Sequence, residues 1–354
     1  MSKIIIIGPC KLAIGGIYSI ISNIKNSVDI QNIDILYVCA DTKRSRTFKI
    51  LKFFIILFKI IGNTIVHSPR DCLFFSSAGA SFWEKSLWGW VLNKLNIRPH
   101  MVMVDGNFPD YYQSLPLFFK RLANRLVSNV NIVAQSSSWS QYYKGIFDKS
   151  VIQIVTGGVD TDYFVPAKLS SQKTDNFVML YVGWVIEKKG IFDLIEAINI
   201  ISKQHYNFSL VIVGPLHEGR KKIDELINLY GLQNIIEIPG HTHSRSELRD
   251  RYQSADIFIF PSHFEGFPVA LIESLSSGLP SIGTKVGGIP DILDHGNCGI
   301  LVDPNNPIQL SNAILELMRN PVLMSRMKAL ARFRVESEYN ISQSVSSYLS
   351  LFGK

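Results

Sequence analysis

Short apolar runs alternate with longer amphipathic stretches along the first half of the chain. The runs predict buried strands, and the stretches between them predict helices. The strands are expected at residues 3–8, 33–39, 72–76, 101–104, 131–134 and 151–155, and the helices at residues 16–24, 45–61, 82–95 and 115–126. Regular alternation of strand and helix is typical of a parallel, doubly wound sheet. We therefore predict an α/β domain over residues 1–166.

The same alternation restarts after a polar stretch at residues 167–176, which we interpret as a linker. Further strands are expected at residues 177–183, 208–214, 235–238, 255–260 and 280–282, with helices between them. This pattern predicts a second α/β domain over residues 177–339.

Length and composition agree with two globular domains. The chain has 354 residues, of which 47% are hydrophobic, enough to bury two cores. Its four cysteines are scattered without Cys-x-x-Cys spacing, which indicates a reducing compartment rather than a disulfide framework or structural zinc. Residues 1–8 have the pattern of a strand and lack that of a signal peptide. We therefore expect a cytoplasmic protein.

Charge is divided unevenly between the two halves. Residues 1–150 carry 18 Lys and Arg against 8 Asp and Glu, a net charge of +10. Residues 151–354 carry 18 against 21, a net charge of −3. A basic first half indicates an anionic partner, either nucleic acid or an anionic membrane surface.

The segment after the strand at residues 255–260 carries the most specific chemistry. Glu265 lies in the expected strand-to-helix loop, and Glu273 lies eight positions later, inside a helix that Pro268 can begin. Two carboxylates facing one crevice suit the hydroxyls of a sugar. The N–H groups at the start of the helix, from Gly266, Phe267 and Val269, suit an oxyanion. Taken alone, acidic residues near a helix start are also explained by the helix dipole.

This segment resembles the nucleotide-binding motif of retaining GT-B glycosyltransferases of family 4: a strand, Pro-Ser, Glu-Gly-Phe-Pro, then a second Glu. The resemblance continues through Ser277-Gly-Leu-Pro280 and Gly287-Gly-Ile-Pro-Asp291, and it is densest over residues 177–303. It implies two Rossmann-like domains facing a cleft, with the acceptor on residues 1–166 and the nucleotide sugar on residues 177–339. It also implies that a last helix, residues 340–354, returns to the first domain.

The resemblance also assigns roles to single residues. Glu273 would bind the nucleotide ribose, and Glu265 with the Gly266-Phe267 backbone would hold the donor sugar. Lys189 would stabilise the leaving diphosphate together with Gly15-Gly16. The donor-binding set implied in this way is Gly15, Gly16, Gly183, Lys189, Glu265, Gly266, Phe267, Pro268, Val269 and Glu273.

Two positions depart from the family pattern. In the loop from Gly183 to Gly190 the family has an arginine where this chain has Trp184, so the missing cation would come from Lys188, Arg220 or Arg245. After the fourth strand the family often has His-Gly, whereas this chain has Asp105 before Gly106. Asp105 is either a catalytic group near the donor sugar or the first residue of an Asx turn.

The chain shows no cluster of metal ligands, and no Asp-x-Asp motif of metal-dependent glycosyltransferases. We therefore expect metal-independent transfer, with no cofactor beyond the nucleotide-sugar substrate. The first loop lacks the Gly-x-Gly-x-x-Gly fingerprint, which disfavours nicotinamide binding. Two alternatives stay open: a sugar-nucleotide 2-epimerase, which has a similar fold, and a non-catalytic nucleotide-sugar-binding protein.

Two segments of the first half combine basic and aromatic residues. Residues 43–61 begin with cations and continue as a Phe- and Ile-rich helix too short to span a bilayer, and residues 82–95 contain three tryptophans. The pattern is typical of an in-plane membrane contact. An ordinary buried crossover helix explains it equally well. No nucleic-acid-binding motif accompanies it. We expect a peripheral contact with an anionic membrane, where a saccharide or polyprenyl-linked acceptor would be met.

Overall fold

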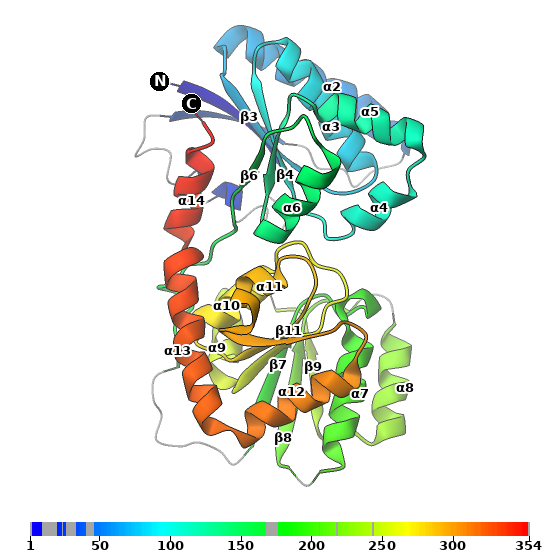
Figure 1. Ribbon diagram of the computed structural model, residues 1–354, viewed down its shortest axis with the longest axis vertical. Coiled ribbons are helices and arrows are strands. Elements are labelled where there is room, and N and C mark those ends of the chain that lie inside the picture. The colour runs from blue at the N-terminus through cyan, green and yellow to red at the C-terminus, as the bar shows by residue number, and fades with distance from the viewer. Residues whose placement is uncertain are drawn as a thin grey trace. The chain divides into compact units, whose positions relative to one another are not determined.

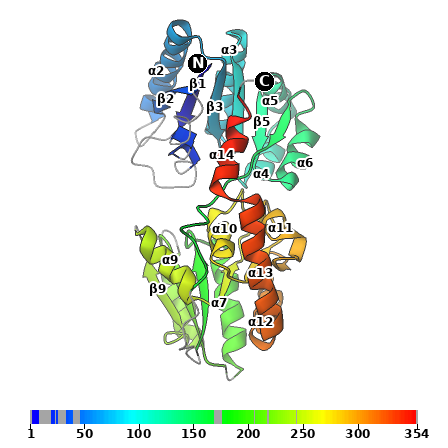
Figure 2. The ribbon, with the colours of Figure 1, turned by 90° about the vertical axis from the view of Figure 1, so that its left-hand side faces the viewer.

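The computed structural model describes residues 2–8, 20–22, 24–25, 33–39, 46–167, 176–204, 206–216, 219–242 and 244–352. The chain divides into two compact units, which are Met1–Gly158 with Ile341–Lys354 and Val159–Asn340. Each unit contains a six-stranded parallel sheet covered by helices (Figures 1 and 2). The predicted α/β class is confirmed.

The first unit has its strands in the order β2-β1-β3-β4-β5-β6. They are β1 (Ser2–Gly8), β2 (Ile33–Cys39), β3 (Asp71–Ser76), β4 (Arg98–Met103), β5 (Asn131–Ala134) and β6 (Ile152–Ile154). The helices are α2 (Arg46–His67), α3 (Ala80–Lys94), α4 (Phe108–Ser114), α5 (Leu117–Val127), α6 (Ser137–Ile146) and α14 (Ile341–Leu349). Successive residues of a strand point to opposite faces of the sheet. Helices α2 to α6 pack on the face to which Phe74 points, and α14 packs on the face to which Leu73 points.

The second unit has the order β12-β11-β10-β7-β8-β9. Its strands are β7 (Phe177–Val182), β8 (Phe208–Val213), β9 (Ile236–Gly240), β10 (Ile257–Phe260), β11 (Ser281–Thr284) and β12 (Gly299–Val302). Its helices are η1 (Glu187–Lys189), α7 (Ile191–Ser202), α8 (Arg220–Tyr230), α9 (Arg245–Ser254), α10 (Val269–Ser276), α11 (Ile289–Ile292), η2 (Asp294–Gly296), α12 (Pro307–Arg319) and α13 (Pro321–Glu338).

Three features differ from the sequence prediction. Strand β12 and helices α4 and α6 were not predicted, nor were the helices between β11 and α14. Strand β12 and helix α4 are four and seven residues long, too short for a clear period. Helix α2 continues to His67, well past the predicted end at residue 61. Val159 and Phe164 pack in a core of the second unit, although the sequence analysis assigned them to the first domain. Most of the proposed linker, residues 168–175, lies outside the described residues.

Candidate active site

The sheet of the second unit changes its winding direction between two adjacent strands, β7 and β10. The chain leaves β7 toward β8 on one side, and it leaves β10 toward β11 on the other. In a doubly wound sheet, such a switch point opens a crevice at the carboxyl ends of the strands, where ligands bind. The two loops that border it carry Lys189 and Glu265.

Two glycines allow the loops to approach each other closely. Gly190 has a φ of 72°, and a Cβ there would lie 1.9 Å from the carbonyl oxygen of Pro261. Gly287 has a φ of 54°, and a Cβ there would lie 1.9 Å from the carbonyl oxygen of Glu265. No other residue type fits either position without displacing backbone. The loop after β10 is therefore held between those after β7 and β11.

This approach pairs the two charged residues predicted to lie in the site. The Lys189 ammonium donates to Oε2 of Glu265 over 2.6 Å and to the carbonyl of Phe264 over 3.3 Å. Both side chains are largely buried, with 22% and 13% of their surfaces exposed. A paired cation and carboxylate at the edge of a crevice offer one group to a phosphate and the other to sugar hydroxyls.

A second polar contact fixes the same loops, and sequence reasoning missed it. Nε2 of His263 lies 2.6 Å from Oδ2 of Asp193 in the first turn of α7. The backbone N–H of His263 also donates to the carbonyl of Lys188 over 3.0 Å. The two side chains are 70 positions apart in the sequence, so only the fold brings them together.

Glu273 lies on α10 and faces a tyrosine of α9. The Tyr252 hydroxyl is 3.0 Å from Oε2 of Glu273 and 3.1 Å from the carbonyl oxygen of Ala270. Burial raises the pKa of Glu273 to about 7, against the opposing effects of Tyr252 and the positive charge of Arg245. The carboxylate is thus poorly solvated, and hydroxyl groups of a ligand would stabilise its ionised form.

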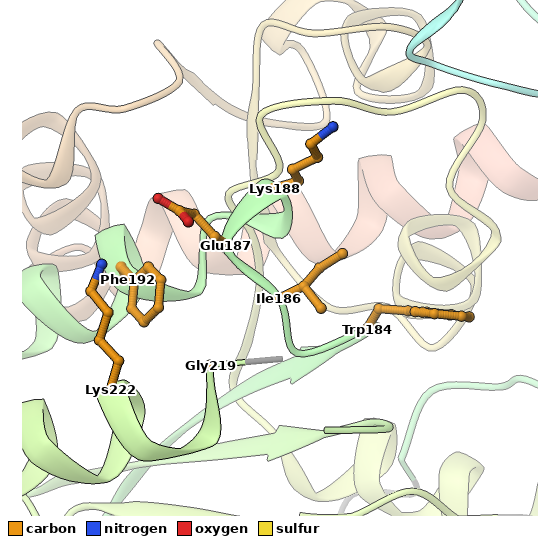
Figure 3. A pocket seen from close by; sticks show the side chains of 7 residues that line it. All are labelled: Trp184, Ile186, Glu187, Lys188, Phe192, Gly219 and Lys222. Atoms are coloured by element: carbon orange, nitrogen blue, oxygen red, sulfur yellow. The ribbon is translucent and has the colours of Figure 1, made fainter. Parts of the chain in front are cut away.

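Trp184, at the family arginine position, lines a cavity of about 570 Å³ together with the residues shown in Figure 3, which are Ile186, Glu187, Lys188, Phe192, Gly219 and Lys222. The indole is 56% exposed, while its backbone carbonyl accepts a bond from the Tyr181 hydroxyl over 2.7 Å. Gly183 lies at the base of this loop, and its carbonyl oxygen would be 1.8 Å from a Cβ on Gly214.

The three cations proposed to replace the arginine differ in their surroundings. Arg220 pairs with Asp224 at 2.7 Å, and Arg245 pairs with Asp160 at 3.2 Å. Lys188 lies 5.6 Å above the Phe264 ring and forms no ion pair with any described residue. Lys188 is also next to Lys189 in the loop. Of the three, it is therefore the best placed to supply the second positive charge.

Residues 167–334 match the family model "Glycosyl transferases group 1". The match covers slightly less than half of the chain, and we call residues 167–334 the group 1 segment. The "Capsular polysaccharide biosynthesis glycosyltransferase CapM" of Staphylococcus aureus is 32% identical over 167 residues, which are 47% of this chain and 43% of that protein. The chain spans less than half the length of the curated relatives that it matches in this way.

Solved structures resemble the whole chain at lower identity. Sucrose-phosphate synthase from Thermosynechococcus elongatus has a TM-score of 0.80 at 17% identity and covers 99% of this chain and 98% of its own. Anabaena Alr3699/HepE, solved in complex with UDP-glucose, has a TM-score of 0.73 at 15% identity and covers 99% and 100%. These likenesses confirm the GT-B fold.

The group 1 segment contains most of the predicted donor residues, but two predictions concern the first unit. Gly15 and Gly16 lie outside the described residues. Asp105 accepts from the N–H groups of Asn107 and Ala78, both over 2.9 Å. The first of these bonds is an Asx turn, so the geometry favours the turn interpretation, with both carboxylate oxygens bound to backbone. A catalytic role for Asp105 stays a prediction.

The helices predicted to touch a membrane are also crossover helices. Ile56 and Ile60 of α2 are buried in the core, whereas Phe58 and Val66 are 71% and 73% exposed. Residues 43–45 and the side chain of Arg46 lie outside what the structure describes. Both interpretations of α2 therefore hold in part: one side fills the core, and the other presents apolar side chains to solvent.

The three tryptophans of α3 have different surroundings. Trp88 is fully buried, so it cannot reach a membrane surface. The indole of Trp83 donates to the Tyr111 hydroxyl over 2.5 Å. Trp90 is 40% exposed. None of the helices within the described ranges is both long and apolar enough to cross a bilayer.

Among the described residues, no three His, Cys, Asp or Glu side chains gather into a group that could hold a metal ion. Metal independence stays a prediction, because a substrate diphosphate can itself contribute metal ligands.

Proposed function

We propose that the protein is a retaining, metal-independent glycosyltransferase of bacterial surface-polysaccharide assembly. It would move a sugar from a nucleotide-sugar donor to a saccharide or lipid-linked saccharide acceptor. The observation that carries the proposal is the Lys189–Glu265 pair at the switch point, inside the segment that matches the group 1 family. The UDP-glucose complex of HepE and the description of CapM support a nucleotide-sugar donor and a polysaccharide product.

Each charged group has a role in this reaction. Glu273 accepts bonds from the ribose hydroxyls, and Glu265 accepts bonds from the sugar hydroxyls. Lys189 stabilises the negative charge that develops on the leaving diphosphate, where electrostatic stabilisation contributes most to the rate. The carbon–oxygen bond to the phosphate breaks, and the acceptor oxygen bonds to the same face of the sugar. The acceptor proton passes to the leaving phosphate.

A thermal-shift panel of UDP, GDP, ADP, dTDP and their sugars tests donor binding directly. A ligand at about 100 times its Kd stabilises the protein by roughly 2.7 kcal/mol. In the Glu265→Ala variant, turnover should fall more than affinity for the free nucleotide, because the partner of Glu265 is the sugar. Loss of nucleotide and nucleotide-sugar affinity to equal extents would contradict that role.

The other proposed functions give different outcomes in the same assays. An epimerase converts the nucleotide sugar without an acceptor, and a binding protein holds it without turnover. Metal-independent transfer continues in excess chelator. Loss of activity in EDTA that magnesium or manganese restores would overturn that part of the proposal.

We also place the reaction at the cytoplasmic face of a membrane, with residues 43–61 and 82–95 as the peripheral contact. The exposed Phe58 and Val66 on α2 and Trp90 on α3 support this placement.

A further inference from the structure

The first turn of α5 exposes large apolar side chains that the core does not use. Leu117 and Phe118 are 73% and 70% exposed, and Phe119 is 43% exposed with its ring 5.8 Å from that of Trp83. The inner side of the same helix is already fixed in the core by Ala123 and Val127. Leaving a leucine and a phenylalanine in water is unfavourable, so a folding role does not explain them.

Cations follow on the same helix. Arg121 and Arg125 are exposed and lie one and two turns beyond Leu117, so the three share one side of α5 over about 12 Å. With Lys149, both arginines line a cavity of about 540 Å³ that Asn124, Ser128 and Asp148 complete. None of the three cations forms an ion pair with another residue that the structure describes. Three cations and one carboxylate suit a phosphate group.

The helices that pack beside α5 are also rich in positive charge. Residues of α2, α3 and α5 pack in one core with β3 and β4, so these helices cover the same face of the sheet (Figure 1). Together they carry nine Lys and Arg but only one acidic residue, Glu84. A protein partner would need a strongly acidic surface around an apolar pocket, whereas an anionic bilayer provides negative charge and apolar depth together.

We propose that α5 is a binding site for the headgroup of an anionic phospholipid. The phosphate occupies the cavity of Arg121, Arg125 and Lys149, while Leu117 and Phe118 enter the acyl boundary. Arg121 and Arg125 lie about 6 and 12 Å beyond Leu117 along the helix axis. The N-terminal end of α5 can therefore enter the acyl boundary while the arginines stay at the level of the lipid phosphates. This site rests on the membrane contact proposed above for residues 43–61 and 82–95 and adds a headgroup site to it, and it does not depend on donor binding.

Vesicle sedimentation of the full chain tests the site with two variants. Vesicles of phosphatidylcholine alone are compared with vesicles in which about one-third of the lipid is phosphatidylglycerol, since such surfaces attract each nearby cation. Arg121→Gln with Arg125→Gln should lower partition to the anionic vesicles by about 10- to 30-fold. Leu117→Ser with Phe118→Ser should lower it at least as much, and the remaining binding should become more sensitive to salt.

Matched controls come from exposed residues elsewhere. Phe333→Ser removes a 68% exposed phenylalanine of α13, and Lys221→Gln removes a cation of α8 that is 92% exposed. Neither should change partition, and all variants should keep their unfolding midpoint and nucleotide binding. Unchanged partition in both α5 variants overturns the proposal. A second result would also overturn it. Millimolar inorganic phosphate would stabilise the protein against unfolding only when the arginines are present, and Leu117→Ser with Phe118→Ser would leave vesicle partition unchanged. That result would show a site for soluble phosphate.

Discussion

Two regions carry positive charge in different surroundings. One is the crevice at the carboxyl ends of β7 and β10, and the other is the first turns of α5. At the crevice, Lys189 is mostly buried and bonded to Glu265 at a fixed distance. On α5, Arg121 and Arg125 are exposed beside apolar side chains. A preorganised, desolvated pair selects one ligand geometry and is weakly screened by salt, whereas exposed cations select any dense negative surface and are strongly screened. The two regions should therefore respond differently to substitution.

The largest effect of a substitution is expected where the backbones of two crevice loops lie close together. We expect Gly190→Ala to lower the free energy of unfolding by several kcal/mol. An L-residue in the left-handed region costs about 1–2 kcal/mol, and the clash with the Pro261 carbonyl adds to this. Chemical denaturation measures the change. Gly231→Ala is the matched control, because its φ of 68° is similar and no atom lies within 4 Å of its Cβ position.

If Gly190→Ala lowers the free energy of unfolding no more than Gly231→Ala does, the two loops are not in contact. The Lys189–Glu265 geometry would then lose its support.

The next largest effect should follow removal of the buried cation. Lys189→Gln should reduce turnover by about 10²–10³-fold, the usual cost of one group that stabilises developing negative charge. Lys188→Gln removes the second positive charge of the same loop and should also reduce turnover, but by a smaller factor, because Lys188 is exposed and pairs with no described carboxylate. Steady-state kinetics with the nucleotide sugar found in the binding panel measures both. Equal losses in the two variants would show that bulk positive charge, not the paired geometry, supports the reaction.

The crevice residues were predictable from sequence to the extent that they are local. Lys189 and Glu265 were predicted to lie in one site because each occupies a fixed place in a strand-loop-helix segment, and the structure pairs them. The role of Glu273 in the site stays a prediction. The His263–Asp193 pair and the Tyr252–Glu273 contact were not found, because each joins elements distant in sequence. No local pattern encodes such a distance.

The apolar surface of the first unit was predicted less well. The basic and aromatic composition of α2 and α3 predicted a membrane contact for both helices. Composition does not show which side of a helix faces the sheet. Trp88 was therefore counted with Trp90, although only Trp90 is exposed. The first turn of α5 was missed because Leu117-Phe-Phe119 looks like ordinary core in a sequence, and only the burial of Ala123 and Val127 assigns the inner side.

The pH dependence of nucleotide binding should separate Glu273 from the other charged groups. Its pKa is about 7 in the folded protein against 4.5 ordinarily, so between these values the folded state holds a proton that the unfolded chain has released. The free energy of unfolding should thus fall as pH rises through this window, by at most about 1.4 kcal/mol per pH unit. Nucleotide affinity should rise across the same window, because ribose hydroxyls donate to the ionised form.

Glu273→Gln should flatten both profiles and weaken nucleotide binding by about 1.5–3 kcal/mol, the contribution of a hydrogen bond to a charged group. Isothermal titration at several pH values measures the affinity. An unchanged affinity and slope in the folded variant would remove Glu273 from the site.

The smallest expected effect concerns Trp90 on α3, and it tests whether the helix layer acts as one surface. Trp90→Ser should lower the free energy of unfolding less than Trp88→Ser does, because Trp90 is 40% exposed and Trp88 is fully buried. It should nevertheless reduce vesicle partition severalfold, because tryptophan favours the membrane interface. Trp88→Ser should do the reverse: the cavity in the core should cost about 3–5 kcal/mol, with partition of the remaining folded protein unchanged. If Trp90→Ser leaves partition intact while the α5 variants abolish it, the membrane contact is confined to α5. If neither matters, the basic layer of the first unit has another partner.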